Sequence, residues 1–319
     1  MKAVVFKSYG PPGVLSIEEI EKPVPKDDEV LVRVHATSVN PAEWYGMTGL
    51  FLARLGNGLF KPKDTRLGAD FSGVVEAVGK EITEFKPGDE VFGGRAGAFA
   101  EYVCVQENVV HKPANITFEE AGSVAIAGLT ALQGLRDYGK LQPGHKVLIN
   151  GASGGVGTFA VQIAKTFGAE VTAVCSTRNV ECARSLGADE VIDYTKEDFT
   201  RSKKRYDLLL DIAGTRSWSE CRRVLNPHAT LVIVGGPKGR VIGPLKHIIG
   251  MRVASFRASQ TVVFFVADFN RKDLSVLREL MESGKVKPIV DRTYPLHKIN
   301  EAMAYLGTGH ARAKIVVTM

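Results

Sequence analysis

The fold is decided by the stretch Val147-Leu-Ile-Asn-Gly-Ala-Ser-Gly-Gly-Val-Gly-Thr-Phe-Ala-Val-Gln-Ile-Ala-Lys165. Its short apolar run predicts a buried strand over residues 146–150. A glycine-rich turn follows, and the helical spacing of the apolar residues after it predicts a helix through Phe167. Strand, glycine turn and helix therefore come in the order that a dinucleotide-binding turn requires.

The turn itself carries a glycine pattern. Ala152-x-Gly154-x-x-Gly157 matches G-x-G-x-x-G except for the alanine in first place. In such a turn Gly154 lets the backbone approach a pyrophosphate and Gly157 lets helix and strand pack closely, while N–H groups at the helix start face the negative charge. The alternative is a glycine-rich turn that binds nothing, but the strand, the spacing and the following pattern all favour the first interpretation. We predict a dinucleotide site at Ser153, Gly154, Gly155, Val156 and Gly157.

Outward from this turn, short apolar runs alternate with helical segments. The runs cover residues 171–174, 191–192, 208–211 and 231–234. Such alternation is typical of a parallel sheet with helices on both faces. We therefore predict an α/β fold whose central domain is a doubly wound Rossmann sheet.

The regions on either side of this domain follow another pattern. Up to about residue 120, turns separate short strands at 30–34, 73–78, 90–92 and 101–105, which predicts a β-barrel. Beyond residue 262, helical patterns over 274–283 and 299–306 precede a closing strand at 314–318. We expect this tail to return to the β-rich part. The predicted domains are a discontinuous one, 1–122 and 262–319, and a nucleotide-binding one, 123–261.

The type of nicotinamide cofactor is decided at the end of the second strand. An Asp or Glu there would bind the ribose 2′-hydroxyl of NAD, but the chain has Ala173-Val-Cys-Ser-Thr-Arg-Asn179. Hydroxyl groups and a guanidinium suit a 2′-phosphate, and Tyr194 after the third strand can bind the same end. We predict NADPH, held here by Ser176, Thr177, Arg178 and Tyr194. The alternative makes Arg178 a solvated residue at a helix start, where a cation opposes the helix dipole.

Composition excludes several other classes of protein. The 41 basic and 35 acidic residues of the 319-residue chain give a net charge of +6, with no dense basic patch of the kind that binds nucleic acid. Four widely spaced cysteines argue against a disulfide scaffold or a zinc lobe. The N-terminus lacks the features of a signal peptide, and no apolar run is long enough to span a bilayer. We expect a cytoplasmic protein that binds neither membranes nor nucleic acid.

Several motifs together resemble one family, the medium-chain dehydrogenase/reductase superfamily in its zinc-independent quinone oxidoreductase-like branch. The motifs are Ser38-Val-Asn-Pro-Ala-Glu-Trp44, Gly68-Ala-Asp-Phe-Ser-Gly-Val-Val-Glu-Ala-Val-Gly79, Lys86-Pro-Gly-Asp-Glu-Val-Phe92, Gly97-Ala-Phe-Ala-Glu-Tyr-Val103, Ala127-Gly-Leu-Thr-Ala131, the glycine turn, and Gly309-His-Ala-Arg-Ala-Lys-Ile-Val-Val317. The resemblance implies a GroES-like β-barrel, a Rossmann domain inserted between its parts, NADPH, enone or quinone substrates, and a homodimer.

Departures from the superfamily's zinc enzymes bear on the mechanism. Asn40 and Ala69 stand where those enzymes carry a cysteine and a histidine, and neither side chain can replace those ligands. We therefore predict no catalytic metal, and for Asp70 a structural rather than a catalytic role. Glu43 and Met47 stand where relatives of the branch commonly have Asp and Arg, so we expect a less cationic entrance to the cleft.

Without a metal, a conjugated carbonyl or a quinone is the more reasonable hydride acceptor. Its developing oxyanion needs donors, and in relatives the loop that would hold Asn40 and Tyr45 lines the cleft. We predict catalytic roles for both; the alternative makes Tyr45, with Trp44, an aromatic cover on the barrel. The resemblance adds Thr130, Gly235 and Phe256 to the cofactor site, the last two on loops after strands. Thr130 can equally be a helix-interior residue bonded to its own backbone.

Two rival functions remain open on the sequence alone. One is an enoyl-thioester reductase, which would need basic residues for the phosphate-bearing arm of its substrate. The other is a protein that binds the nucleotide without turnover, as a sensor or structural protein. Both keep the whole cofactor site, so cofactor binding does not separate them from the quinone or enone reductase.

Overall fold

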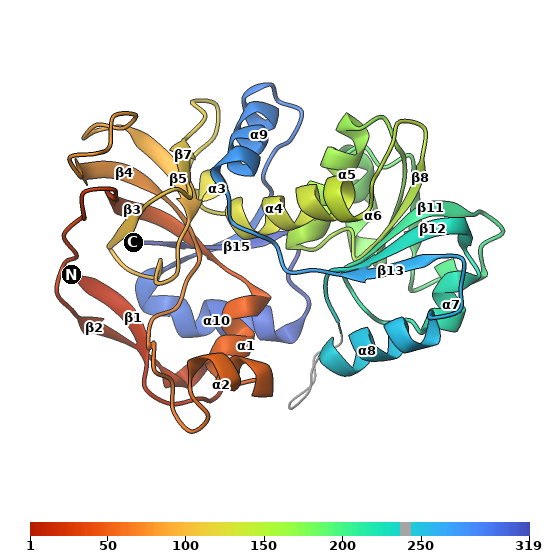
Figure 1. Cartoon of the computed structure of the whole chain (residues 1–319), viewed down its shortest axis with the longest axis horizontal. Coiled ribbons are helices and arrows are strands. Elements are labelled where there is room, and N and C mark those ends of the chain that lie inside the picture. The colour runs from red at the N-terminus through yellow and green to blue at the C-terminus, as the bar shows by residue number, and fades with distance from the viewer. Residues whose placement is uncertain (237–243) are drawn as a thin grey trace. The chain divides into compact units, whose positions relative to one another are not determined.

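The structure, a computed structural model, describes residues 1–236 and 244–319. Two compact units make up the chain: unit 1 comprises residues 1–129, 269–284 and 288–319, and unit 2 comprises residues 130–268 and 285–287 (Figure 1). The predicted domain boundaries after residues 122 and 261 stay a prediction.

Unit 2 is built on a six-stranded parallel sheet. Its strand order is β10-β9-β8-β11-β12-β13, which steps outward from β8 in both directions as a doubly wound sheet does. The strands are β8 (Lys146–Asn150), β9 (Glu170–Cys175), β10 (Glu190–Asp193), β11 (Tyr206–Asp211), β12 (Leu225–Ile233) and β13 (Thr261–Phe264). The predicted Rossmann sheet is thus confirmed.

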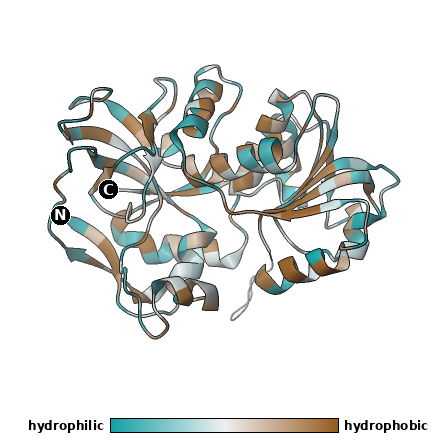
Figure 2. Cartoon of the chain, viewed as in Figure 1, coloured by the Kyte–Doolittle hydropathy of each residue, from teal (hydrophilic) through white to brown (hydrophobic). Residues whose placement is uncertain are grey.

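Helices cover both faces of this sheet. In Figure 1, α5 (Gly155–Thr166) and α6 (Val180–Ser185) lie over one face, and α7 (Trp218–Arg222) and α8 (Pro244–Ala254) lie over the other. Both faces are therefore apolar, and Figure 2 shows the sheet mostly brown. Leu148, Leu209 and Leu231 are register neighbours, fully buried on one face. Ile149, Leu210 and Val232 are fully buried on the other face. Short helical turns η3 (Thr177–Asn179) and η4 (Phe199–Arg201) complete the unit.

Unit 1 holds a seven-stranded sheet with the order β14-β15-β3-β4-β5-β7, and β6 pairs with β3. The strands are β3 (Val30–Val39), β4 (Asp70–Val78), β5 (Glu90–Gly94), β6 (Tyr102–Val105), β7 (Val109–His111), β14 (Val290–Pro295) and β15 (Lys314–Thr318). A separate pair joins β1 (Lys2–Phe6) and β2 (Leu15–Glu19). The last strand, β15, pairs antiparallel with β3, so the tail does return to the β-rich part, as predicted.

The helices of unit 1 pack on this β structure. They are α1 (Pro41–Thr48), α2 (Phe51–Asn57), α3 (Phe118–Ala121), α9 (Arg271–Glu282) and α10 (Ile299–Thr308), with the turns η1 (Pro12–Val14) and η5 (Leu296–Lys298). Helix α4 (Ala125–Gln133) begins in unit 1 and ends in unit 2, followed by a π-helical turn, η2 (Gly134–Tyr138).

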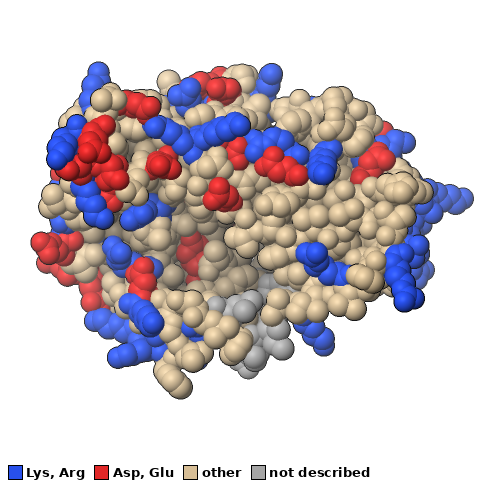
Figure 3. Space-filling view, viewed as in Figure 1, with Lys and Arg blue, Asp and Glu red and all other residues tan. Residues whose placement is uncertain are grey.

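Surface and helix properties add two findings. None of the helices in the described part of the chain is long and apolar enough to cross a bilayer. On the face drawn in Figure 3, Lys and Arg side chains are interspersed with Asp and Glu.

Candidate functional site

The glycine turn of unit 2 joins β8 to α5. Gly151 has a φ of +92°, a left-handed conformation that glycine adopts without steric cost. Gly154 is the N-cap of α5, and the first intrahelical bond runs from the amide of Thr158 to the Gly154 carbonyl at 3.0 Å. The amides of Gly155, Val156 and Gly157 precede this bond, so they belong to the group of N–H donors that a helix start offers to an anion.

Two glycines of the turn face different surroundings, and this tests whether a dinucleotide fits. A Cβ at Gly157 would lie 2.2 Å from the carbonyl oxygen of Gly151, so only glycine allows the helix to pack this closely. A Cβ at Gly154 would meet only that same oxygen, at 3.5 Å. The backbone is therefore crowded behind Gly157 and open in front of Gly154, as a turn that receives a pyrophosphate needs.

The predicted 2′-phosphate segment follows β9 and folds into η3. Asn179, which sequence reasoning missed, is only 4% exposed, and its Nδ2 donates to Ser153 Oγ at 3.0 Å and to Ser176 Oγ at 3.2 Å. This amide thus brings the two predicted parts of the cofactor site together. Because both serine oxygens accept these bonds, neither serine uses its own hydroxyl proton in them. Arg178, between Ser176 and Asn179 in the sequence, is exposed.

Thr177 differs from the prediction. Its hydroxyl donates to Asp193 Oδ2 at 2.6 Å, so the proton that the sequence offers to a phosphate is already committed. Hydrogen bonds from Thr177 and Thr195 hold the pKa of Asp193 down to about 2. Asp193 ends β10, and a prediction based on the residue types after β9 alone does not foresee that its carboxylate takes this hydroxyl. Tyr194 follows it and is exposed.

The remaining predicted cofactor residues occupy three different settings. Thr130 is half-buried on α4. Gly235 follows β12, and a Cβ there would lie 2.2 Å from the Ile212 carbonyl oxygen, so its backbone is tightly packed. Phe256 is 87% exposed in the turn after α8, not on a loop after a strand. That placement was wrong because the apolar run before Phe256 forms helix α8, and the next strand, β13, starts only at Thr261.

In unit 1, Asn40 and Tyr45 belong to a helix and not to a loop. Asn40 is the N-cap of α1, Pro41 follows it, and Glu43 reaches back so that its Oε2 accepts the Asn40 amide at 2.8 Å. An N-cap residue, a proline after it and an acid three residues on form a recognised helix start, so Asn40-Pro-Ala-Glu43 carried the signal that the loop prediction overlooked.

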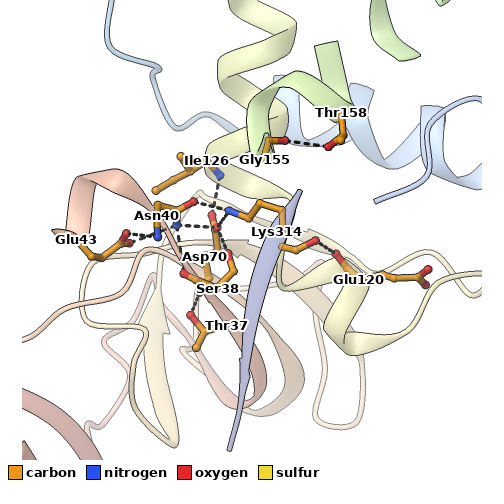
Figure 4. A network of polar contacts seen from close by, with 11 residues as sticks. Thr37, Ser38, Asn40, Glu43, Asp70, Glu120, Ile126, Gly155, Thr158 and Lys314 are labelled. Carbon is orange, nitrogen blue, oxygen red and sulfur yellow. Dashed lines mark hydrogen bonds and ion pairs between the residues drawn. The ribbon is translucent and has the colours of Figure 1, made fainter. Parts of the chain in front are cut away.

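The side chain of Asn40 lies in a buried polar cluster, which we define as Ser38, Asn40, Glu43, Asp70 and Lys314 (Figure 4). Lys314 Nζ lies 3.1 Å from Asp70 Oδ2 and donates to Asn40 Oδ1. Asn40 Nδ2 donates to Asp70 Oδ2 at 3.1 Å and to the Ser38 carbonyl at 3.2 Å. The cluster thus gives Asp70 the structural hydrogen-bonding contacts expected of it.

Burial and charge within the cluster strongly shift the pKa of one carboxyl group. Desolvation, and then the nearby negative charge of Asp70, raise the pKa of Glu43 to about 7, although Lys314 acts in the opposite direction. Met47 is fully buried in the apolar core of the unit and Glu43 is 5% exposed. Neither side chain reaches the surface, and the less cationic entrance to the cleft stays a prediction.

The two aromatic residues of α1 differ from each other. Trp44 packs on the apolar core of unit 1, and a Cβ at Gly307 of α10 would lie 2.3 Å from its ring. Tyr45 is half-buried, burial raises the pKa of its phenol, and its hydroxyl makes no hydrogen bond to any residue in the described ranges. Trp44 therefore fits an aromatic cover on the barrel, whereas Tyr45 keeps a donor for a ligand.

Known proteins match this chain along most of its length. Residues 26–115 match the family model described as the alcohol dehydrogenase GroES-like domain, and residues 186–317 match the one described as zinc-binding dehydrogenase. The chloroplastic quinone-oxidoreductase QR1 of Triphysaria versicolor is 34% identical over 99% of this chain and 98% of its own. The chain belongs to the medium-chain dehydrogenase/reductase superfamily, in its quinone oxidoreductase-like branch.

Two further members of this superfamily are similar over almost the whole chain. The chloroplastic NADPH-dependent alkenal/one oxidoreductase of Arabidopsis thaliana is 35% identical over 99% of this chain and 79% of its own. The quinone oxidoreductase structure from Coxiella burnetii has a TM-score of 0.86 at 30% identity and covers 100% of this chain and 99% of its own. The similarity supports an oxidoreductase with a nicotinamide cofactor. The cytoplasmic location and the homodimer stay predictions.

The zinc of other members of the superfamily does not fit the residues present here. Asn40 and Ala69 replace two ligands, and the Asp70 carboxylate is already paired with the ammonium of Lys314. A Zn²⁺ ion beside that ammonium would meet like charge. Among the described residues, no group of three or more His, Cys, Asp and Glu side chains is arranged to hold a metal.

Proposed function

We propose that the protein is an NADPH-dependent, zinc-independent oxidoreductase that transfers a hydride to a quinone or an α,β-unsaturated carbonyl compound. The observation that carries this proposal is the glycine turn, crowded at Gly157 and open at Gly154. Names of relatives support the substrate class, since these include a quinone oxidoreductase and an alkenal/one oxidoreductase.

The residues of unit 2 would hold the cofactor in parts. Ser153 and the helix start bind the pyrophosphate, Ser176 and Arg178 bind the 2′-phosphate, and Tyr194 covers the adenosine end. Residues assigned to the nicotinamide end are Thr130 and Gly235. When bound, NADPH supplies the hydride, which is the chemistry that the protein itself cannot provide.

In unit 1, Tyr45 is the residue that would meet the reacting oxygen. Its hydroxyl donates a hydrogen bond to the oxyanion that develops on the substrate, and burial keeps the phenol protonated by raising its pKa. The amide of Asn40 is engaged on both sides by Lys314 and Asp70, so it acts by positioning rather than by donating to substrate. No metal is needed, since a conjugated acceptor is already electrophilic at carbon.

The test combines binding and turnover. Calorimetry with NADPH and NADH is expected to show tighter binding of NADPH, and absorbance at 340 nm is expected to fall with quinones or enones. Activity only with enoyl thioesters would support the rival reductase, and NADPH binding without turnover across the panel would support a sensor. Failure to bind either cofactor would overturn the proposal. Tyr45→Phe is expected to lower kcat by roughly 10²- to 10³-fold with the Kd for NADPH unchanged.

A further inference from the structure

The cluster beneath α1 contains a lysine that no function described above requires. Lys314 lies on β15 and its residue is 3% exposed, while its partner Asp70 on β4 is fully buried. An ammonium group is costly to remove from water unless opposite charge and hydrogen bonds compensate for it. The Asp70 carboxylate and the Asn40 amide oxygen supply that compensation.

The charges of this pair determine which way the amide of Asn40 points. Lys314 has only donors, so the amide oxygen must face it; the Asp70 carboxylate has only acceptors, so the amide nitrogen must face that side. Nδ2 makes further contacts with the Ser38 carbonyl at 3.2 Å and Glu43 Oε1 at 3.5 Å. The amide is therefore held in one orientation by groups of opposite character.

The same cluster fixes the starts of two helices. At α1, the backbone amide of the N-cap residue Asn40 donates to Glu43 Oε2 at 2.8 Å. At α4, the backbone amide of Ile126 donates to Asp70 Oδ1 at 2.7 Å. Asp70 thus shares its two oxygens between the start of α4 and the side chains below α1, and Lys314 neutralises it (Figure 4).

We propose that Lys314 is a positioning residue: its ammonium group holds the Asn40 amide and the Asp70 carboxylate together and so fixes the start of the helix that carries Tyr45. The proposal rests on the proposed function, in which Tyr45 contacts the substrate.

The kinetic test compares three variants of the full chain. Lys314→Met keeps most of the length of the side chain but removes its charge. The resulting misplacement of Tyr45 is expected to lower kcat by roughly 10- to 100-fold, while the Kd for NADPH changes less than about twofold. Lys314→Arg retains the charge and is expected to recover part of kcat. Lys112→Met is the matched control, because Lys112 is a second nearly buried lysine of unit 1, 3.0 Å from Glu90. It is expected to leave kcat unchanged.

A second readout does not depend on activity. Infrared spectroscopy of the folded protein follows the protonation of Glu43, identified by its loss in Glu43→Gln. Because Lys314 lowers the pKa of Glu43 and Asp70 raises it, Lys314→Met is expected to move that pKa upward and Asp70→Asn to move it downward. A lysine that only filled space would not give these opposite shifts.

The outcomes separate the two proposals. If the wild type shows no turnover but the two variants shift the pKa of Glu43 in opposite directions, the coupling of Glu43 to the charges of Lys314 and Asp70 stands. The proposed function then fails. If the wild type turns over and Lys314→Met, well folded, keeps its kcat, the positioning role is overturned. Should Lys314→Met not fold, Lys314→Met combined with Asp70→Asn removes both charges; an unchanged kcat in that double variant overturns the proposal equally, and a loss of kcat supports it.

Discussion

The glycine turn after β8 and the buried polar cluster beneath α1 are assembled differently. The turn is contiguous, residues 151–157, and neighbouring backbone atoms set its shape. The cluster joins side chains as much as 274 positions apart in the chain, and opposite charges hold it. One region therefore depends on the absence of side chains and the other on their charge. A substitution that adds a methyl group threatens the first, and one that removes a charge threatens the second.

The largest expected effect belongs to the cluster. Asp70→Ala leaves the ammonium of Lys314 buried without its counter-ion, and the free energy of unfolding is expected to fall by about 3–5 kcal/mol. Chemical denaturation measures this free energy of unfolding. Glu90→Ala, which removes the half-exposed partner of Lys112, is the control and is expected to cost less than about 1 kcal/mol. Equal losses in the two variants would show that burial of the pair makes no difference.

The pH dependence of stability distinguishes two helix-capping acids, Glu43 in unit 1 and Glu220 in unit 2. The pKa of Glu43 is about 7 when folded, against about 4.3 in an unfolded chain. Between those values unfolding releases a proton, so the free energy of unfolding falls as pH rises, by about 4 kcal/mol in all. Glu43→Gln keeps the cap and is expected to abolish this fall.

The contribution of Glu220 to the pH dependence of stability has the opposite sign. Its hydrogen bond from Ser217 lowers its pKa, so its contribution to stability is present above the unfolded value and is lost as pH falls through the folded one. Denaturation of Glu43→Gln and Glu220→Gln at several pH values between 3 and 8 measures both slopes. Parallel curves for the two variants would contradict the assigned directions.

The cofactor preference tests the segment after β9. Arg178→Ala is expected to weaken NADPH by about 1.5–3 kcal/mol, or roughly 10- to 100-fold, and to affect NADH much less, because only NADPH has the 2′-phosphate. Arg184→Ala serves as the control, since Arg184 is an exposed arginine paired with Glu181 on α6. Calorimetry measures the affinity of each of the two variants for NADPH and for NADH. Equal weakening of both cofactors would mean that Arg178 does not contact the phosphate.

The smallest expected change in stability concerns the glycine turn. Gly157→Ala places a methyl group against the Gly151 carbonyl, and the free energy of unfolding is expected to fall by about 1–3 kcal/mol. Gly154→Ala meets open space and is expected to cost less than about 1 kcal/mol, while still blocking NADPH. Denaturation paired with calorimetry separates the two effects. Normal NADPH affinity in Gly154→Ala would place the pyrophosphate elsewhere.

Local signals explain where prediction from the sequence succeeded. The strand, turn and helix around Gly154 follow from apolar spacing and glycine positions, which act over neighbouring residues. The helix start at Asn40 also had a local signal, in Pro41 and Glu43, and was overlooked because the segment was interpreted as a loop. Phe256 was misplaced because a short apolar run does not distinguish a helix from a buried strand.

By itself, the sequence determined the Rossmann sheet, the glycine turn and the lack of metal ligands at Asn40 and Ala69, since each depends on residue type or short-range spacing. Only the tertiary structure decided that Lys314 meets Asp70, that Asp193 takes the hydroxyl proton of Thr177, and that Asn179 joins two parts of the cofactor site. The physical reason is that buried charges and amides choose their partners across strands, and pairing between strands brings together residues that sequence distance keeps apart.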